Sequence, residues 1–247
     1  MSDDPLYRDP ELVDFYDLEN GVWDDFGFCI ELARDARSLL DLGCGTGQLA
    51  AMSADGQRRV AGVDPAAAML EVARKRDGGD KVRWVEAPAE TVRLGEKFDL
   101  IMLTGHAFQV FLTDEAISAV LTTIAAHLEP EGRFIFDTRN PLCQEWREWV
   151  PDTSQRIVPH PVYGDVKAWN DVAFDDATAI ATYQTFYEIA ATGKTLSASS
   201  QIRFMGKPRL EALLAEAGLR ADRWLGDWKG EPFHEQAKEI IPIGRLG

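Results

Sequence analysis

The sequence has few cysteines and no long apolar run. Its 247 residues include only Cys29, Cys44 and Cys143, which are widely spaced and form no Cys-x-x-Cys pair. This pattern favours reduced, packed thiols over a disulfide framework or a structural zinc site, and we expect no bound metal. No stretch of about 18 apolar residues is present, and the N-terminus is acidic where a signal peptide would be basic. We therefore expect a soluble, cytoplasmic protein without a membrane partner.

Basic residues are also scarce. The chain carries 26 Lys and Arg against 41 Asp and Glu, which gives a formal net charge of −15. Proteins that bind nucleic acids need clustered cations to displace counterions from phosphates, so we expect no nucleic-acid partner. The length, with 45% hydrophobic residues, allows one substantial core, and we expect a single α/β domain with an elaboration.

From residue 37 onward, short apolar runs alternate with amphipathic stretches. This alternation predicts β-α-β units around a doubly wound, mostly parallel seven-stranded sheet with helices on both faces. A surface helix is expected behind a cap at Thr113, ending before Pro130 and Gly132. The expected strands are residues 38–42, 59–64, 81–86, 98–103, 133–137, 220–225 and 239–245.

After residue 150 the apolar residues alternate with polar ones, a period typical of strands. We predict an antiparallel ribbon of about three strands that covers the open end of the sheet as a lid. We therefore expect three parts: a pair of N-terminal cap helices (1–36), a Rossmann-like domain in two segments (37–149 and 206–247), and the inserted lid (150–205).

A glycine-rich segment directly follows the first expected strand. Gly43, Gly45 and Gly47 allow a sharp backbone turn and close approach of a ligand to the main chain. A dinucleotide fingerprint would need a third glycine at the position of Gln48, so an NAD-dependent oxidoreductase is disfavoured but stays open. Asp64, at the end of the second strand, is placed to accept hydrogen bonds from both hydroxyls of a ribose.

Together, the segments 39–47 and 60–65, followed by Met69 and Leu70, resemble the first two motifs of the class I (Rossmann-like) S-adenosylmethionine-dependent methyltransferases. The layout is closest to small-molecule methyltransferases with an antiparallel insertion after the fifth strand. The resemblance implies S-adenosylmethionine as the cofactor and S-adenosylhomocysteine as the product. It also implies that the three glycines pack against the methionine and ribose, that Asp41 helps to position the methionine amino group, and that Asp64 holds the ribose.

The adenine end of the expected site departs from the family pattern. Members often carry an acidic residue after the third strand, but Pro88 occupies that position here. The backbone N–H of Ala89 and the side chain of Glu90 are the expected substitutes, although Glu90 also fits a solvated helix start. Tyr16, with Tyr7 and Trp23, either folds over the cofactor or packs in the core. The further expected cofactor contacts are Pro65 and Thr104.

The methyl acceptor is expected beyond the carboxyl ends of the fourth and fifth strands. His106 is the candidate catalytic base, since its ordinary pKa lies near neutral pH, or it contacts substrate by hydrogen bonding alone. Arg139 either pairs with a substrate carboxylate or forms an ion pair with Asp137. The expected substrate-binding residues are His106, Gln109, Arg139 and Asn140.

Methyl transfer from a sulfonium depends mainly on alignment in a water-poor pocket, so few dedicated groups are needed. The Asn/Asp-Pro-Pro-aromatic motif of nucleobase amino-methyltransferases is absent after the fourth strand. We therefore predict transfer to a small-molecule acceptor, at nitrogen rather than oxygen. A non-catalytic cofactor-binding or protein-interaction module is the alternative, and a homodimer is considered. Aromatic residues of the ribbon either line the acceptor pocket or pack sheet to sheet: Trp169, Tyr183, Phe186 and Tyr187.

Overall fold

The central sheet of the computed structural model, which describes residues 4–21 and 24–247, confirms the expected α/β class. Its strands lie in the order β11-β12-β5-β4-β1-β2-β3, and the two-residue strand β6 adds to β12 at one end. Only β12 runs antiparallel to its neighbours. The strands are β1 (Ser38–Leu42), β2 (Arg59–Asp64), β3 (Val82–Glu86), β4 (Phe98–Leu103), β5 (Leu128–Phe136), β6 (Thr138–Arg139), β11 (Leu219–Leu225) and β12 (Glu239–Leu246).

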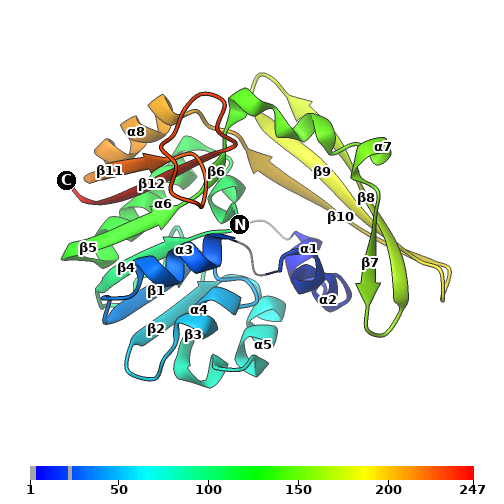
Figure 1. Cartoon of the computed structure of the whole chain (residues 1–247), viewed down its shortest axis with the longest axis horizontal. Helices are drawn as coiled ribbons and strands as arrows, with labels where there is room; N and C mark the ends of the chain where they lie inside the picture. The colour runs from blue at the N-terminus through cyan, green and yellow to red at the C-terminus, as the bar shows by residue number, and fades with distance from the viewer. Residues whose placement is uncertain (1–3, 22–23) are drawn as a thin grey trace.

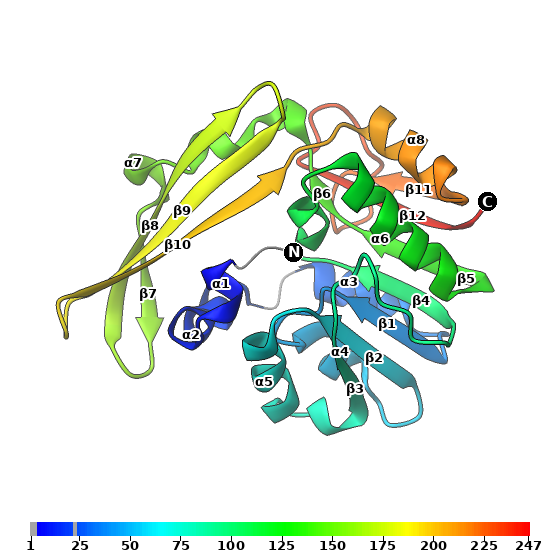
Figure 2. The same ribbon diagram turned by 180° about the vertical axis from the view of Figure 1, so that it is seen from behind.

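Helices cover both faces of this sheet (Figures 1 and 2). Successive residues of β1 and β4 point to opposite faces and so enter two different cores. Leu39 and Leu100 pack with the helices α3 and α4, whereas Leu40 and Ile101 pack with α6 and α8. The covering helices are α3 (Asp24–Leu32), α4 (Gln48–Ser53), α5 (Ala67–Lys75), α6 (Asp114–His127) and α8 (Lys207–Glu216).

The helix α6 begins as expected and ends earlier than expected. The hydroxyl of Thr113 accepts a hydrogen bond from the N–H of Ala116 at 3.2 Å, which caps the first turn. The helix ends at His127, and Pro130 and Gly132 lie inside β5 rather than at a helix end. At Gly132 a Cβ would lie 2.8 Å from the carbonyl oxygen of Phe98, so this glycine permits close strand contact.

The second sheet has four antiparallel strands rather than about three, in the order β10-β9-β8-β7. The additional strand is β7, whose Pro159 and following Pro161 masked its strand character in the sequence. Proline is tolerated there because β7 is an edge strand. The strands are β7 (Arg156–His160), β8 (Gly164–Asp175), β9 (Ile180–Ile189) and β10 (Lys194–Arg203), all within the expected lid segment.

Three leading helices replace the expected two: α1 (Pro5–Arg8), α2 (Pro10–Glu19) and α3. Asp9 ends α1 as its C-cap and begins α2 as its N-cap, because its carboxylate accepts from the N–H of Glu11 at 2.9 Å. Leu12 and Phe15 of α2 pack against the inner face of the four-stranded sheet. The α1 and α2 helices therefore lie between the two sheets (Figure 1).

Short helical segments occur in the remaining connections: η1 (Gly79–Lys81), η2 (Ala107–Val110), η3 (Pro141–Cys143), η4 (Glu145–Glu148) and α7 (Pro151–Ser154). Within residues 4–21 and 24–247, we find no helix whose length and apolar character would suit it to cross a bilayer.

Candidate active site

The loop between β1 and α4 turns through three residues in the left-handed region. Gly43, Gly45 and Gly47 have φ values of 76°, 52° and 73°. Gly43 and Gly45 line a large cavity, so the absence of Cβ leaves their backbone open to a ligand. Gly47 does not line it. A Cβ there would lie 2.3 Å from the indole of Trp84, so packing beneath the loop requires Gly47, and its cofactor contact stays a prediction.

Two carboxyl groups lie close to this loop. Asp64 lines the cavity and accepts hydrogen bonds from the N–H groups of Gly45 at 2.9 Å and Ala66 at 2.8 Å, which fix its orientation. Burial raises the pKa of Asp64, although these hydrogen bonds act in the opposite sense. Asp41 lies behind the loop and is 3% exposed; burial, and then the charge of Asp64, raise its pKa to about 7.

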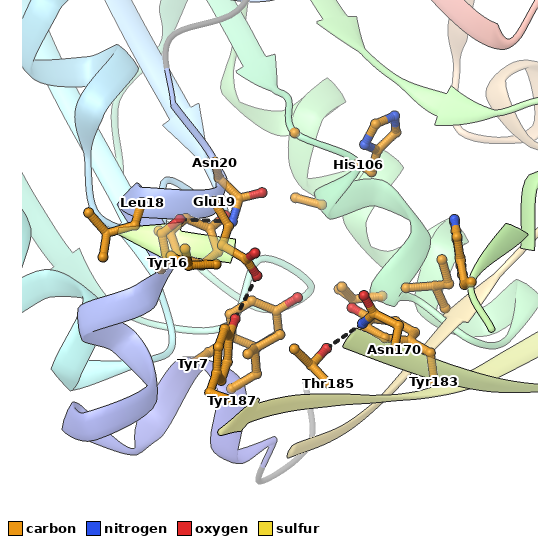
Figure 3. Close-up of a pocket in the computed structure, with 18 of the residues that line it drawn as sticks. Tyr7, Tyr16, Leu18, Glu19, Asn20, His106, Asn170, Tyr183, Thr185 and Tyr187 are labelled. Atoms are coloured by element: carbon orange, nitrogen blue, oxygen red, sulfur yellow. Dashed lines mark hydrogen bonds between the residues drawn. The ribbon is translucent and has the colours of Figure 1, made fainter. Parts of the chain in front are cut away.

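The cavity measures about 550 Å³ and lies between the two sheets. Its walls come from the N-terminal helices, the loops after β1, β2 and β4, and the inner face of the lid sheet. In Figure 3, Tyr16, Glu19 and Asn20 of the N-terminal segment lie across the cavity from His106. Burial raises the pKa of the Tyr16 hydroxyl, which therefore remains a hydrogen-bond donor at neutral pH.

His106 stands in the loop after β4 and has a φ of 61°, directly after Gly105 at 67°. Its backbone N–H donates to the carboxylate of Asp137 at 3.1 Å, which holds this turn. Its ring atom Nε2 lies 3.0 Å from Glu239 Oε1 and 3.4 Å from Asp137 Oδ2. In the neutral tautomer whose Nε2–H points at these carboxylates, Nδ1 carries the lone pair.

The carboxylates around His106 are strongly buried. Asp137 is 1% exposed, and burial raises its pKa to about 6 even though the charge of His106 acts to lower it. Burial would also raise the pKa of Glu239, but the hydrogen bond and charge of His106 and the charge of Arg139 outweigh it and lower that pKa. Glu239 was not predicted from the sequence, because it lies 133 positions after His106.

Of the expected acceptor residues other than His106, Arg139 lines the cavity and the two amides do not. Arg139 lines the cavity, and its guanidinium lies 5.2 Å from the ring centre of Trp149. It donates to Gln109 Oε1 at 2.9 Å and lies 3.7 Å from Glu145, so the ion pair expected with Asp137 is replaced by these contacts.

Gln109 and Asn140 do not reach the cavity. Gln109 is 1% exposed and donates to the carbonyl of Arg203 at 3.2 Å, so it positions Arg139. Asn140 is also 1% exposed and donates to the carbonyls of Glu235 and Ala237. Both amides therefore have internal hydrogen-bond partners, and the substrate contacts that we expected for them stay predictions.

The aromatic residues divide between the two faces of the lid. Tyr183 and Tyr187 line the cavity together with Tyr7 and Tyr16. Trp169 and Phe186 instead stack on each other, with ring centres 5.1 Å apart, and neither lines the cavity. Trp23 lies outside the described residues.

The remaining expected cofactor contacts do not line the cavity: Pro65, Ala89, Glu90 and Thr104. Pro88 accepts hydrogen bonds from the N–H groups of Thr91 and Val92, and Ala89 is 1% exposed inside this turn. An adenine contact at this end therefore stays a prediction.

Comparisons with known proteins agree with this geometry. Residues 39–132 match the family model described as a methyltransferase domain. The chain is 27% identical to a cypemycin N-terminal methyltransferase from Streptomyces over 98% of both chains. It is 25% identical to a dTDP-3-amino-3,4,6-trideoxy-α-D-glucopyranose N,N-dimethyltransferase of Streptomyces venezuelae, over 76% of this chain and 77% of that one.

A solved structure shares the fold across both sheets. An S-adenosylmethionine-dependent methyltransferase from Clostridium acetobutylicum superposes with a TM-score of 0.80 at 18% identity, covering 96% of this chain and 98% of that one. Given the glycine loop, Asp64, the methyltransferase-domain match over residues 39–132 and the shared fold, the protein is an S-adenosylmethionine-dependent enzyme with the class I methyltransferase fold.

Proposed function

We infer that the protein methylates a nitrogen atom of a small-molecule acceptor held between the glycine loop and the lid sheet. The observation that supports this proposal is the position of His106. This residue lines the cavity, and its Nε2 is hydrogen-bonded to Glu239. S-Adenosylmethionine supplies an electrophilic methyl group. As an amine attacks it, the nitrogen gains positive charge and must release a proton, which Nδ1 of His106 can accept.

The residues present fit this cofactor. Gly43 and Gly45 offer backbone without Cβ, and Asp64 presents a carboxylate to the same cavity. We propose that Asp64 binds the ribose hydroxyls, that Asp41 orients the methionine amino group, and that the adenine lies towards Pro65, Ala89 and Glu90. Arg139 is proposed to bind an anionic or polar group of the acceptor.

The choice of nitrogen over oxygen is supported by the extent of the matches. Two relatives whose matches cover 98% and 76% of this chain are named as an N-terminal methyltransferase and an N,N-dimethyltransferase. A malonyl-acyl-carrier-protein O-methyltransferase of Anoxybacillus flavithermus matches 43% of this chain, at 32% identity. The longer of these matches therefore support nitrogen as the acceptor atom.

The function is tested by incubating the enzyme with S-adenosylmethionine and paired amines and alcohols, and by following S-adenosylhomocysteine and methylated products by mass spectrometry. We expect product from amines only. His106→Asn should lower kcat about 100-fold or more with unchanged cofactor affinity. Methylated alcohols without methylated amines would contradict the proposal.

Glu239→Gln tests whether the carboxylate orients His106. We expect kcat to fall about tenfold or more, because an amide no longer fixes the Nε2–H tautomer or balances the charge that His106 gains. The Kd of S-adenosylmethionine and the melting temperature should stay unchanged. Glu235→Gln, at an exposed position in the same segment, is the matched control. Equal kcat values for the two variants would remove Glu239 from the mechanism.

A further inference from the structure

One wall of the cavity is the free edge of the lid sheet. β7 is last in the strand order, and among the described residues β8 is the one strand paired with it. Four consecutive residues, from Arg156 to Pro159, line the cavity. Successive residues of a strand point to opposite faces, so a wall formed by consecutive residues is a strand edge. The edge presents to the cavity those N–H and C=O groups that β8 does not use.

The facing wall is the carboxyl end of α2, where Leu18, Glu19 and the following Asn20 line the cavity. Leu18 is 41% exposed and Ile157 of β7 is 60% exposed. They are two of the five strongly exposed large apolar side chains in the described part of the chain. Because both residues line the cavity and contact solvent, the cavity reaches the surface between α2 and β7.

The inner side of this passage is polar. Tyr187 donates to Glu19 at 2.7 Å, and Asn170 donates to Thr185 at 2.8 Å; all four side chains line the cavity (Figure 3). These four side chains and the backbone edge of β7 make this part of the wall polar. A compact acceptor such as an amino sugar would leave the strand edge without a partner.

We propose that the acceptor nitrogen is the N-terminal amine of a peptide, whose first residues leave the cavity as an extended chain along β7. This rests on the proposed function and names its substrate class. Main-chain hydrogen bonds from a strand edge bind extended peptides. An edge of four residues accommodates about three or four peptide residues, at about 3.3 Å per residue. Pro159 has no N–H, so at that position the edge only accepts.

Charge also favours this acceptor. A peptide amino terminus arrives as a cation, and the chain has a net charge of −15. The carboxylate of Glu19 lines the passage but is paired with Arg156, whereas Asp137 and Glu239 lie beside His106 at the inner end. The carboxylates beside His106 attract an ammonium group to this inner end.

The test compares α-amine acceptors of increasing length: amino-acid amides, dipeptide amides and hexapeptide amides, all with free N-termini and with the peptides of mixed sequence. An amino sugar is tested alongside them. We expect kcat/KM for the hexapeptides to exceed that for the amino-acid amides about tenfold or more. Replacing the second peptide N–H by an ester oxygen should remove part of this gain. Equal kcat/KM for all lengths, or a preference for the amino sugar, would overturn the inference.

A protein variant gives an independent measurement. Leu18→Asp should lower kcat/KM for hexapeptides about tenfold while leaving the amino-acid amides within about twofold. Leu142→Asp is the control, because Leu142 is 65% exposed and does not line the cavity. If amines are methylated without dependence on length or on Leu18, only this inference fails. If no amine is methylated by enzyme that binds S-adenosylmethionine, the proposed function fails as well.

Discussion

Asp41 carries a buried carboxyl group at the end of β1, where it is 3% exposed. Its pKa of about 7 lies above the ordinary value of 3.8, because burial and then the charge of Asp64 disfavour ionisation. The folded chain therefore binds this proton more tightly than the unfolded chain between about pH 4 and pH 7. The contribution of Asp41 to the free energy of unfolding falls as pH rises through this window, by on the order of 4 kcal/mol.

Asp41→Asn removes this ionisation while keeping the shape of the side chain. We expect the variant without cofactor to be more stable than the wild type at pH 8, by about 1–4 kcal/mol, and the difference to shrink towards pH 5. Urea unfolding at a series of pH values measures it. Asp176→Asn, at an exposed position, should change little. Lower stability of the Asn variant at pH 8 would show that the buried charge is compensated.

The same substitution separates stability from binding. If Asp41 orients the methionine amino group, its carboxylate is retained despite its cost to folding, as is common at binding sites. Titration calorimetry should then show S-adenosylmethionine binding about tenfold weaker in Asp41→Asn. An unchanged Kd would assign Asp41 to the turn alone.

At the scale of elements, α2 is joined to the lid by two ion pairs of different burial. Arg156 of β7 donates through Nε and Nη2 to both oxygens of Glu19, whose side chain is 14% exposed, and Tyr187 donates to the same carboxylate. Lys194 and Glu11 form the second pair, in which both side chains are 49% exposed. The pair of Arg156 and Glu19 is bidentate and less exposed than the pair of Lys194 and Glu11. We therefore expect it to supply most of the interaction energy between α2 and the lid.

Double-mutant cycles compare the two pairs. Glu19→Gln with Arg156→Gln should give a coupling energy of about 1–3 kcal/mol, whereas Glu11→Gln with Lys194→Gln should give below about 0.5 kcal/mol. Hydrogen exchange in Arg156→Gln should rise in α1 and α2 more than in β1 and β4. A larger coupling for the exposed pair would contradict this assignment.

The central sheet was predictable from sequence because its strands are continuous apolar runs between turn signals. β1, β2 and β4 begin and end where expected, whereas β5 begins earlier, at Leu128. β7 was missed because an edge strand tolerates proline, which normally marks the absence of a strand. The sequence indicated two leading helices where the structure has three, because a single residue, Asp9, is both the C-cap of α1 and the N-cap of α2.

The convergence of Gly43, Gly45 and Asp64 on one cavity could be predicted because these residues are close together in sequence. Gly43, Gly45 and Asp64 all lie within two neighbouring β-α turns. The acceptor half depends on contacts between distant segments. Glu239 reaches His106 because the start of β12 pairs with β6, directly after Asp137. The internal partners of Gln109 and Asn140 could not be predicted for the same reason, since they come from β10 and from residues 235–237.

At the scale of the whole molecule, one cavity is enclosed by parts of the chain that are far apart in sequence. Tyr16 comes from the N-terminal helices, Asp64 and His106 from the central sheet, and Tyr183 from the lid. A ligand that fills the cavity therefore contacts all three parts at once. Ligand binding therefore stabilises the packing of these three parts against one another, as well as the local structure of each.

This arrangement predicts a large and specific stabilisation by S-adenosylhomocysteine. At a ligand concentration of about 100 times Kd, binding adds about 2.7 kcal/mol to the free energy of unfolding. For a chain of this size, that raises the melting temperature by roughly 5–10 °C. Hydrogen exchange should slow in α1, α2 and β9 as well as in the loop after β1, because all of them contribute cavity walls.

Asp64→Asn should fold and lose most of the shift in melting temperature, since an amide can accept only one of the two proposed ribose hydrogen bonds in the same geometry. A full shift in Asp64→Asn, or protection confined to the loop after β1, would show that the ligand does not join the three parts.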